Sequence, residues 1–341
     1  MKNIIAKVAE RRDLTAEEAE QAALDIMEGR AGEAEMASFL TAMRMKGETP
    51  EEIAAIARVM RQKCRRVSSP EDAMDLCGTG GAKVKTYNVS TVSSIVVAST
   101  GVPVAKHGNR SFTSRSGSAD LLESLGVNIS IEPEMASRML HEGGITFLFA
   151  PLYHPATRNV SPVRKALPFR TVFNILGPIT NPANVHRQLV GVFSEDYVDK
   201  VAQALSILGT EKAMVVHGRI GIDELSPSGE TEVTEVKNGV TESYTITASE
   251  FSGFGLEEWS VPQTASPGES ALFANRVLAG KSGFGERSIV LLNAGAALYV
   301  AGRVRSVEDG MGKALESIEK GRALEKMNEF VLLSSGGRDN G

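Results

Sequence analysis

Between Lys106 and Gly126 the chain collects groups that attract anions, in the stretch KHGNRSFTSRSGSADLLESLG. Lys106, Arg110 and Arg115 are cationic, and His107 becomes so when protonated. Lysine offers a point charge, hydroxyls offer hydrogen bonds, and glycines let backbone N–H groups approach a ligand closely. A solvated charged loop is the alternative interpretation. The apolar segment VPVA before the stretch and the helix-like run after it favour an anion-binding loop.

A second stretch suited to anions is CGTGGAKVKTYNVST, which starts at Cys77. Its spacing matches neither a P-loop nor a dinucleotide-binding fingerprint. Taken alone, its glycines fit a tight strand-to-helix turn as well as they fit a phosphate cradle. Asn88, Ser90 and Thr91 follow where a helix is expected to begin. A helix N-terminus that bears hydroxyls also attracts anions, so the stretch offers two elements for one phosphate site.

Adjacent carboxylates occur at Asp223 and Glu224, in GIDELS, just after an apolar segment. In proteins Mg²⁺ takes one or two carboxylates and shares the oxygens of a bound phosphate. If the pair stood alone, an ordinary acidic turn would be the better interpretation. Beside two loops that favour phosphate, the pair indicates a magnesium site.

A longer block, HPATRNVSPVRKALPFRTVFNILGPITNP, begins at His154. Its Arg164 and Arg170 could hold a carboxylate through paired hydrogen bonds, because guanidinium and carboxylate geometries match. Surface arginines on a helix are the alternative. His154 could be a ligand or a base, but a single histidine before proline is more often structural.

From residue 73 onward, short apolar segments alternate with polar loops and helical patterns, which indicates an α/β fold with a mostly parallel sheet. Polar loops follow the apolar segments at 78–88, 106–118, 150–164 and 218–226. Ligands of open α/β sheets bind at the carboxyl ends of the strands, so these loops are expected to surround one site. Near 238, Asn-Gly predicts a tight hairpin turn.

The first 65 residues predict helices, because Thr15 with Glu18 and Thr49 with Glu52 have capping-box spacing. The predicted fold is therefore α/β with a small N-terminal helical domain and a large α/β domain around a mostly parallel central sheet. The expected boundaries are 1–70 for the helical domain, joined by a helical segment around 163–185, and 71–341 for the α/β domain.

Composition narrows the functional classes. The net charge of −5 argues against a nucleic-acid-binding surface, which needs a basic face. Only two cysteines occur, Cys64 and Cys77, without metal or redox spacing, which favours a reducing, cytoplasmic setting. The longest apolar run, which starts at Ile289, is too short to cross a bilayer, so no membrane partner is expected.

Together these loops resemble the anthranilate phosphoribosyltransferase family. The matching motifs are GTGG at 78–81, NVST at 88–91, KHGNR at 106–110, SGSAD at 116–120, HPA at 154–156, VRKALPFRTVFNILGPITNP at 163–182 and GIDE at 221–224. They extend over most of the chain. The long block is very specific, whereas KHGNR is shared with pyrimidine nucleoside phosphorylases.

The resemblance implies transfer of phosphoribose from phosphoribosyl pyrophosphate (PRPP) to anthranilate, with Mg²⁺, in tryptophan biosynthesis. It also implies a homodimer that meets through the N-terminal helices. The implied PRPP contacts are Gly78, Gly81, Thr86, Asn88, Ser90, Thr91, Lys106, Asn109, Ser114 and Ser118. The implied anthranilate contacts are Gly78, His107, Asn109, His154, Arg164 and Pro178, of which His107 and Arg164 are assigned to catalysis. The implied Mg²⁺ groups are Ser90, Asp223 and Glu224.

One departure from the family pattern stands in the glycine stretch. The family has Asp after GTGG, whereas this chain has Ala82, followed by Lys83 and then Lys85. Two other functions remain open at this point. A pyrimidine nucleoside phosphorylase would use the cationic loop for inorganic phosphate without needing the acidic pair. A non-catalytic relative that binds nucleic acid would need a basic groove, against which the net charge counts.

Overall fold

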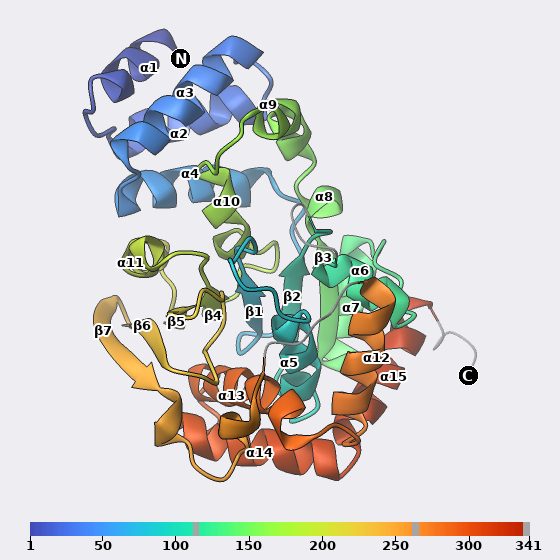
Figure 1. Cartoon of the computed structure of the whole chain (residues 1–341). Coiled ribbons are helices and arrows are strands. Elements are labelled where there is room, and N and C mark those ends of the chain that lie inside the picture. Colours follow the sequence, from blue (N-terminus) through green and yellow to red (C-terminus); the bar gives the residue numbers. More distant parts are fainter. Residues whose placement is uncertain (112–115, 261–265, 337–341) are drawn as a thin grey trace.

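The structure, a computed structural model, describes residues 1–111, 116–260 and 266–336. Its N-terminal part is a bundle of α1 (Lys2–Ala9), α2 (Ala16–Met27), α3 (Glu33–Lys46) and α4 (Pro50–Lys63). Both predicted capping boxes are present, at Thr15 with Glu18 and at Thr49 with Glu52. Figure 1 shows this bundle at one end of the molecule, away from the C-terminal helices.

Within the described residues, seven strands form one sheet in the order β3-β2-β1-β4-β5-β6-β7. They are β1 (Met74–Gly78), β2 (Val104–Gly108), β3 (Ile145–Phe149), β4 (Arg187–Gly191), β5 (Lys212–Gly218), β6 (Glu230–Lys237) and β7 (Val240–Thr247). The first five pair in parallel, and β6 and β7 add an antiparallel hairpin. Asn238 and Gly239 both have positive φ, of 50° and 84°, as the predicted tight turn requires. The mostly parallel sheet is confirmed.

Helices surround the sheet. They are α5 (Val89–Ala98), α6 (Ser118–Ser124), α7 (Pro133–Gly143), α11 (Val198–Ile207), α12 (Pro267–Leu278), α13 (Phe284–Val300), α14 (Val307–Glu319) and α15 (Arg322–Ser334). One apolar core joins α5, α13 and α14 to the sheet. A second core joins the N-terminal bundle and α11 to β4 and β5. The helical bundle is therefore packed on the α/β domain by a shared core.

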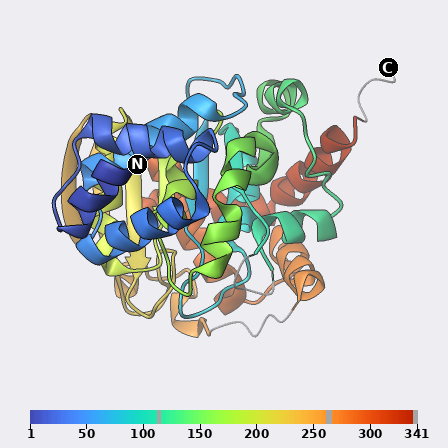
Figure 2. The same cartoon turned by 90° about the horizontal axis from the view of Figure 1, so that it is seen from above.

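A connector at 150–185 runs between the two parts of the fold and contains α8 (Ala150–Tyr153), α9 (Ser161–Ala166) and α10 (Phe173–Leu176). Val160 and Val163 pack in the core of the N-terminal bundle. Figure 2 shows the connector, in green, beside the blue bundle. The chain thus returns to the bundle before β4. The domain boundaries at 70 and 71 stay a prediction.

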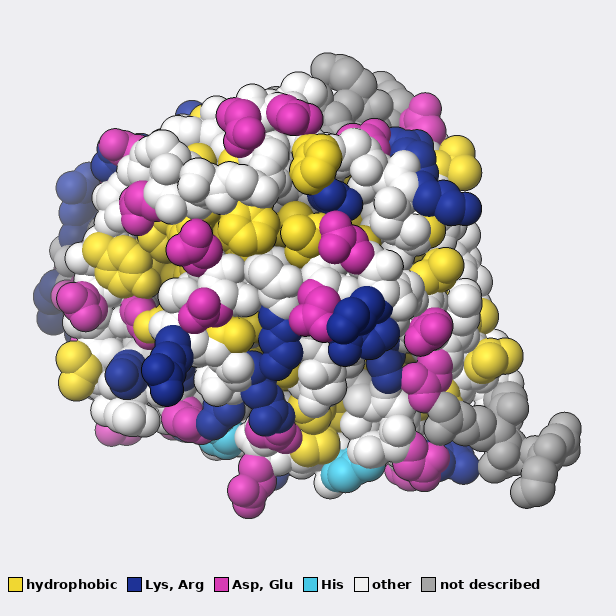
Figure 3. Space-filling model, turned by 90° about the horizontal axis from the view of Figure 1, so that it is seen from below, with side chains coloured by type: hydrophobic (Ala, Val, Ile, Leu, Met, Phe, Trp, Pro, Cys, Tyr) yellow, Lys and Arg dark blue, Asp and Glu magenta, His cyan; other side chains and the backbone are white. Residues whose placement is uncertain are grey.

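The described surface mixes charges of both signs, and Figure 3 shows Lys and Arg side chains interspersed with Asp and Glu on the face opposite Figure 2. Among the helices in the described part of the chain, none has the combination of length and apolar character that crossing a membrane requires.

Candidate active site at the carboxyl edge of the sheet

The glycine loop begins at Gly78, where β1 ends. Gly80 and Gly81 have φ values of 65° and 76°, in the region that favours glycine. The loop is tied to its neighbours: the N–H of Thr79 donates to the carbonyl of Gly191 at 2.9 Å, and the N–H of Gly80 donates to Asp223 Oδ2 at 2.8 Å. A Cβ added at Gly78 would lie 2.6 Å from the same Asp223 oxygen. Glycine is therefore what lets the acidic pair approach this loop.

The predicted metal residues Ser90, Asp223 and Glu224 come together, since all three line one small cavity. Glu224 is buried, and its Oε1 accepts a hydrogen bond from Thr86 Oγ1 at 2.8 Å. Its Oε2 is buried with no hydrogen-bond partner among the described residues. Burial, and then the charge of Asp223, raise the pKa of Glu224 to about 8, and burial also raises the pKa of Asp223.

A divalent cation fits this arrangement, because an orphaned carboxylate oxygen beside a second carboxylate lacks a positive partner. Within the described ranges, no group of three or more His, Cys, Asp or Glu is placed to hold a metal ion. Any cation here must therefore complete its coordination with hydroxyl, water or phosphate oxygens. That requirement favours Mg²⁺, which shares its coordination with bound phosphates.

The start of α5 meets the cationic loop after β2. Asn88 precedes α5 with a left-handed φ of 60°, and its Nδ2 donates to Ser116 Oγ at 3.0 Å. Lys106 Nζ donates to Ser90 Oγ at 3.4 Å and to the carbonyl of Leu76 at 2.5 Å. Thr91 is buried, and its hydroxyl has no partner in the described structure. Four of the residues predicted to contact PRPP therefore lie around the start of α5: Asn88, Ser90, Thr91 and Lys106.

Further along the cationic loop, Asn109 and Ser118 contact each other. The N–H of Asn109 donates to Ser118 Oγ, and that hydroxyl donates to the carbonyl of Asn109, both at 3.1 Å. Arg110, which the sequence places among the anion-seeking groups, instead pairs with Asp120 and Glu123 on α6. The charge of Arg110 is therefore paired with these two carboxylates rather than directed toward a bound anion. The predicted contact at Ser114, like Arg115, lies outside the described residues.

His107 and His154 form a buried pair whose ring centroids lie 5.2 Å apart. His107 Nδ1 lies 3.0 Å from the carbonyl of Gly177, the residue before Pro178. Because a carbonyl only accepts, Nδ1 carries the proton and the Nε2 of neutral His107 is an acceptor. Neither His107 Nε2 nor His154 Nε2 has a partner among the described residues. Burial lowers the pKa of His107 to about 3 and that of His154 to about 4.

The two arginines of the long block separate. Arg164 lies on α9, with its guanidinium carbon 5.5 Å from the centroid of the Phe173 ring, and burial lowers its pKa. Arg170 donates to the carbonyl of Gly81 and lies over the Phe193 ring. They contact different aromatic rings, and joint binding of one carboxylate by the two arginines stays a prediction. Arg164 remains the candidate for the acceptor, whereas Arg170 contacts the glycine loop.

One supporting residue escaped sequence reasoning. Asp75 lies inside β1, fully buried, where it accepts hydrogen bonds from the N–H of His107 at 3.2 Å and from Asn181 Nδ2 at 2.9 Å. It ties β1 to the first residues of the cationic loop and to the end of the long block. A charged residue within the apolar segment AMDLC was the available signal, since carboxylates are rarely buried without partners.

Known proteins resemble this chain over nearly its whole length. The helical bundle domain of the glycosyl transferase family matches residues 2–64, and the a/b domain of that family matches residues 70–324. Anthranilate phosphoribosyltransferase of Rubrobacter xylanophilus is 48% identical over 98% of this chain and 97% of its own length. The Aquifex aeolicus protein of that name is 45% identical, over 98% of each chain.

Solved structures agree in fold. The crystal structure of anthranilate phosphoribosyltransferase from Thermus thermophilus has a TM-score of 0.90 and 39% identity, over 97% of this chain and 99% of that chain. The Saccharomyces cerevisiae enzyme in complex with PRPP and Mg has a TM-score of 0.87 and 26% identity, over 98% and 99% of the two chains.

Proposed function

The chain belongs to the anthranilate phosphoribosyltransferase family, and we propose that it transfers the 5-phosphoribosyl group of PRPP to anthranilate. The amine nitrogen of anthranilate forms a bond to the anomeric carbon of the ribose as the bond from that carbon to pyrophosphate breaks. The products are N-(5-phosphoribosyl)anthranilate, pyrophosphate and the proton that the amine loses. This is a step of tryptophan biosynthesis.

One observation carries the proposal that the site binds PRPP: the acidic pair, Asp223 and Glu224, is hydrogen-bonded to the glycine loop and the segment that follows it. Asp223 holds the N–H of Gly80, Glu224 holds Thr86, and both carboxylates line a cavity with Ser90. Asp223, Glu224 and Ser90 would hold Mg²⁺, and the yeast relative was solved in complex with PRPP and Mg. When bound there, Mg²⁺ would offset negative charge on the departing pyrophosphate.

Donor binding draws on the groups around the start of α5. Lys106 supplies a buried positive charge beside Ser90, while Gly78, Gly81, Thr86, Asn88, Thr91, Asn109, Ser114 and Ser118 are the further groups assigned to PRPP. The ribose carbon becomes electron-poor as pyrophosphate departs, so stabilising the leaving group lowers the barrier. Holding donor and acceptor in one site supplies a further part of the acceleration.

We assign acceptor binding to Gly78, His107, Asn109, His154, Arg164 and Pro178. His107 is neutral near pH 7, and its Nε2 is an acceptor without a partner among the described residues, which suits an amine N–H. An aromatic amine is scarcely protonated at neutral pH, so no strong base is needed. Arg164 is a half-buried cation suited to the carboxylate of anthranilate.

The proposal is tested by incubating the protein with PRPP, Mg²⁺ and anthranilate and following the loss of anthranilate fluorescence. Loss should require all three components. Parallel reactions with inorganic phosphate and uridine or thymidine should release no free base. Phosphorolysis of either nucleoside, without consumption of anthranilate, would assign the chain to nucleoside phosphorolysis instead.

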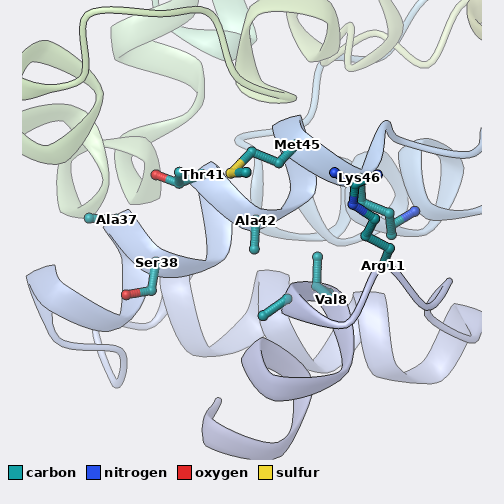
Figure 4. Close-up of a pocket in the computed structure, with 9 residues that line it drawn as sticks. Val8, Arg11, Ala37, Ser38, Thr41, Ala42, Met45 and Lys46 are labelled. Carbon is teal, nitrogen blue, oxygen red and sulfur yellow. The ribbon is translucent and has the colours of Figure 1, made fainter.

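We also propose that the chain forms a homodimer through its helical bundle. Figure 4 shows residues of α1 and α3 that line a pocket: Val8 and Ala42 point toward each other, and Met45 lies farther along α3. Met45 is 69% exposed, unusual for a large apolar side chain, and burial against a second copy would remove it from water. The free thiols of Cys64 and Cys77 support a reducing, cytoplasmic setting.

A further inference from the structure

Arg170 contacts the backbone of the glycine loop from the connector between α9 and α10. Its Nη2 donates to the carbonyl oxygen of Gly81. Gly81 has a φ of 76°, and a Cβ added there would lie only 2.6 Å from Arg170 Nη2. The contact therefore depends on glycine for both the backbone conformation and the space. A guanidinium held against a backbone carbonyl in this way fixes where the peptide groups of the loop point.

Phe193 holds the other side of the same loop. The guanidinium carbon of Arg170 lies 3.9 Å from the centroid of the Phe193 ring, within the range of a cation–π contact. The N–H of Phe193 donates to Thr79 Oγ1 at 3.0 Å. Arg170 and Phe193 thus contact each other, and each bonds to the loop, Arg170 at Gly81 and Phe193 at Thr79.

The contacts continue into the helical bundle. The Phe193 ring lies 5.2 Å from the ring of Tyr197, whose hydroxyl accepts a hydrogen bond from Arg44 Nη1 of α3 at 2.9 Å. The same hydroxyl donates to the buried Glu48 at 3.3 Å. An unbroken series of side-chain contacts therefore joins the bundle to the glycine loop by way of Arg170.

Arg170 also lies on the donor side of the site. The negative charge of Asp223 acts on its guanidinium, and Asp223 itself holds the N–H of Gly80. In contrast, Arg164 of α9 lies over the ring of Phe173. The two arginines of one sequence block therefore have different contact partners, and only Arg170 contacts the glycine loop.

We propose that Arg170 is a positioning residue for PRPP, which holds the backbone of Thr79–Gly81 in the conformation that receives pyrophosphate. The proposal rests on the phosphoribosyl transfer proposed above and adds a role to it. Arg170 acts through the loop, and it does not bind the carboxylate of the acceptor. Its link to Phe193 and Tyr197 makes the loop conformation depend on how the helical bundle is seated.

The test compares three variants with the unaltered chain. Arg170→Met removes the hydrogen-bond donor to Gly81 and keeps most of the side-chain bulk, whereas Arg170→Lys keeps a positive charge. Arg158→Met is the matched control, because it removes an exposed arginine from the same connector. The first measurement is hydrogen–deuterium exchange of the amides of residues 79–85 in the absence of substrates. These amides should exchange faster in Arg170→Met, recover in part in Arg170→Lys, and match the unaltered chain in Arg158→Met.

The second measurement is the steady-state KM for each substrate. In Arg170→Met the KM for PRPP should rise about tenfold or more, the size expected when a charged donor leaves a hydrogen bond. The KM for anthranilate and the kcat at saturating PRPP should change little, because saturating donor orders the loop itself. Arg170→Lys should recover part of the loss. Thermal unfolding of each variant shows whether it is folded, and Arg170→Lys carries the test if Arg170→Met is not.

Two outcomes would overturn the proposal. Unchanged exchange at residues 79–85 in Arg170→Met would show that the contact does not hold the loop. A rise in the KM for anthranilate equal to that for PRPP would indicate that Arg170 also binds anthranilate. Failure of the unaltered chain to consume anthranilate would instead reject the proposed function, and the exchange measurement would still report on the loop.

Discussion

Burial decides the chemistry of His107. Its Nδ1–H is committed to the carbonyl of Gly177, and its Nε2 is left as an acceptor beside His154. Because burial lowers the pKa of His107 to about 3, the ring stays neutral throughout the physiological range. A neutral acceptor suits a weakly basic amine, which arrives unprotonated and loses its proton only as the new bond forms.

The same burial makes stability depend on pH. The pKa of His107 falls from 6.5 in the unfolded chain to about 3 in the folded one, so the unfolded state takes up the proton first. This contribution to stability is present above pH 6.5 and is lost as the pH falls toward 3. Between pH 7 and pH 5 the loss from His107 should be about 2 kcal/mol.

Urea unfolding at pH 7 and pH 5 measures this loss. His107→Asn retains an N–H for Gly177 and does not titrate, so its free energy of unfolding should fall by about 2 kcal/mol less than that of the unaltered chain. Equal losses in the two proteins would mean that folded His107 accepts a proton by pH 5.

Arg164 is the residue that we expect to discriminate between the substrates. A carboxylate matches the planar fork of a guanidinium, so Arg164→Ala should raise the KM for anthranilate about tenfold or more and leave the KM for PRPP nearly unchanged. Arg158→Ala, which removes an exposed arginine from the same connector, is the control. Equal losses for both substrates, or a loss for PRPP alone, would show that Arg164 is misassigned.

The positions of the loops that form the site were predictable from the sequence, but the contacts between the loops were not. Parallel strands bring GTGG, KHGNR and GIDE to one edge of the sheet, and this follows from strand and loop patterns alone. The bond from Gly80 to Asp223 joins residues far apart in sequence, and no local pattern encodes it. Arg110 shows the converse, since the motif around it favours anions but its own helix partners Asp120 and Glu123 satisfy it.

The glycine loop carries the departure at Ala82, which is 5% exposed. A carboxylate at this buried position would have to find a metal ion or an N–H donor, whereas Ala82 needs neither. Nearby, the charge of Lys85 opposes the rise in the pKa of both Asp223 and Glu224. The loop therefore brings positive charge of its own to the acidic pair.

We expect Ala82→Asp to require more Mg²⁺ for its half-maximal rate than the unaltered chain, with a higher KM for PRPP at low Mg²⁺. The added carboxylate repels pyrophosphate directly and binds it only through a bridging metal ion. Magnesium titrations of both proteins at fixed PRPP measure the difference. Identical titration curves would show that residue 82 does not set the Mg²⁺ requirement, and a large gain in kcat on substitution would show that Ala82 impairs catalysis.

For the whole molecule, the shared core between the helical bundle and the sheet is the central feature. Leu40 and Met43 of α3 lie in the same apolar core as Val190 of β4 and Val215 of β5. The bundle is therefore packed against the α/β domain. The surface of α1 and α3 that faces away from this core is free to make another contact. Sequence reasoning predicted these helices from their caps, but the core they share with β4 and β5 is a tertiary contact that caps do not reveal.

The proposed dimer makes this outward surface testable. Met45→Glu places a charge on an exposed side chain that lines the pocket between α1 and α3, and it should convert the dimer to a monomer in sedimentation velocity experiments. Leu332→Glu is the control, because Leu332 is also a large exposed side chain, at 60%, but lies on α15, far from the bundle in Figure 1. A dimer that survives Met45→Glu would place the interface elsewhere.

Release of pyrophosphate from PRPP shows directly whether the chain transfers phosphoribose to anthranilate. It is followed with and without anthranilate, in the unaltered chain and in the double variant Asp223→Asn, Glu224→Gln. We expect one pyrophosphate for each anthranilate consumed, release that requires Mg²⁺, and loss of most of this activity in a double variant that remains folded. Full turnover in the double variant, or release that does not depend on anthranilate, would contradict this expectation.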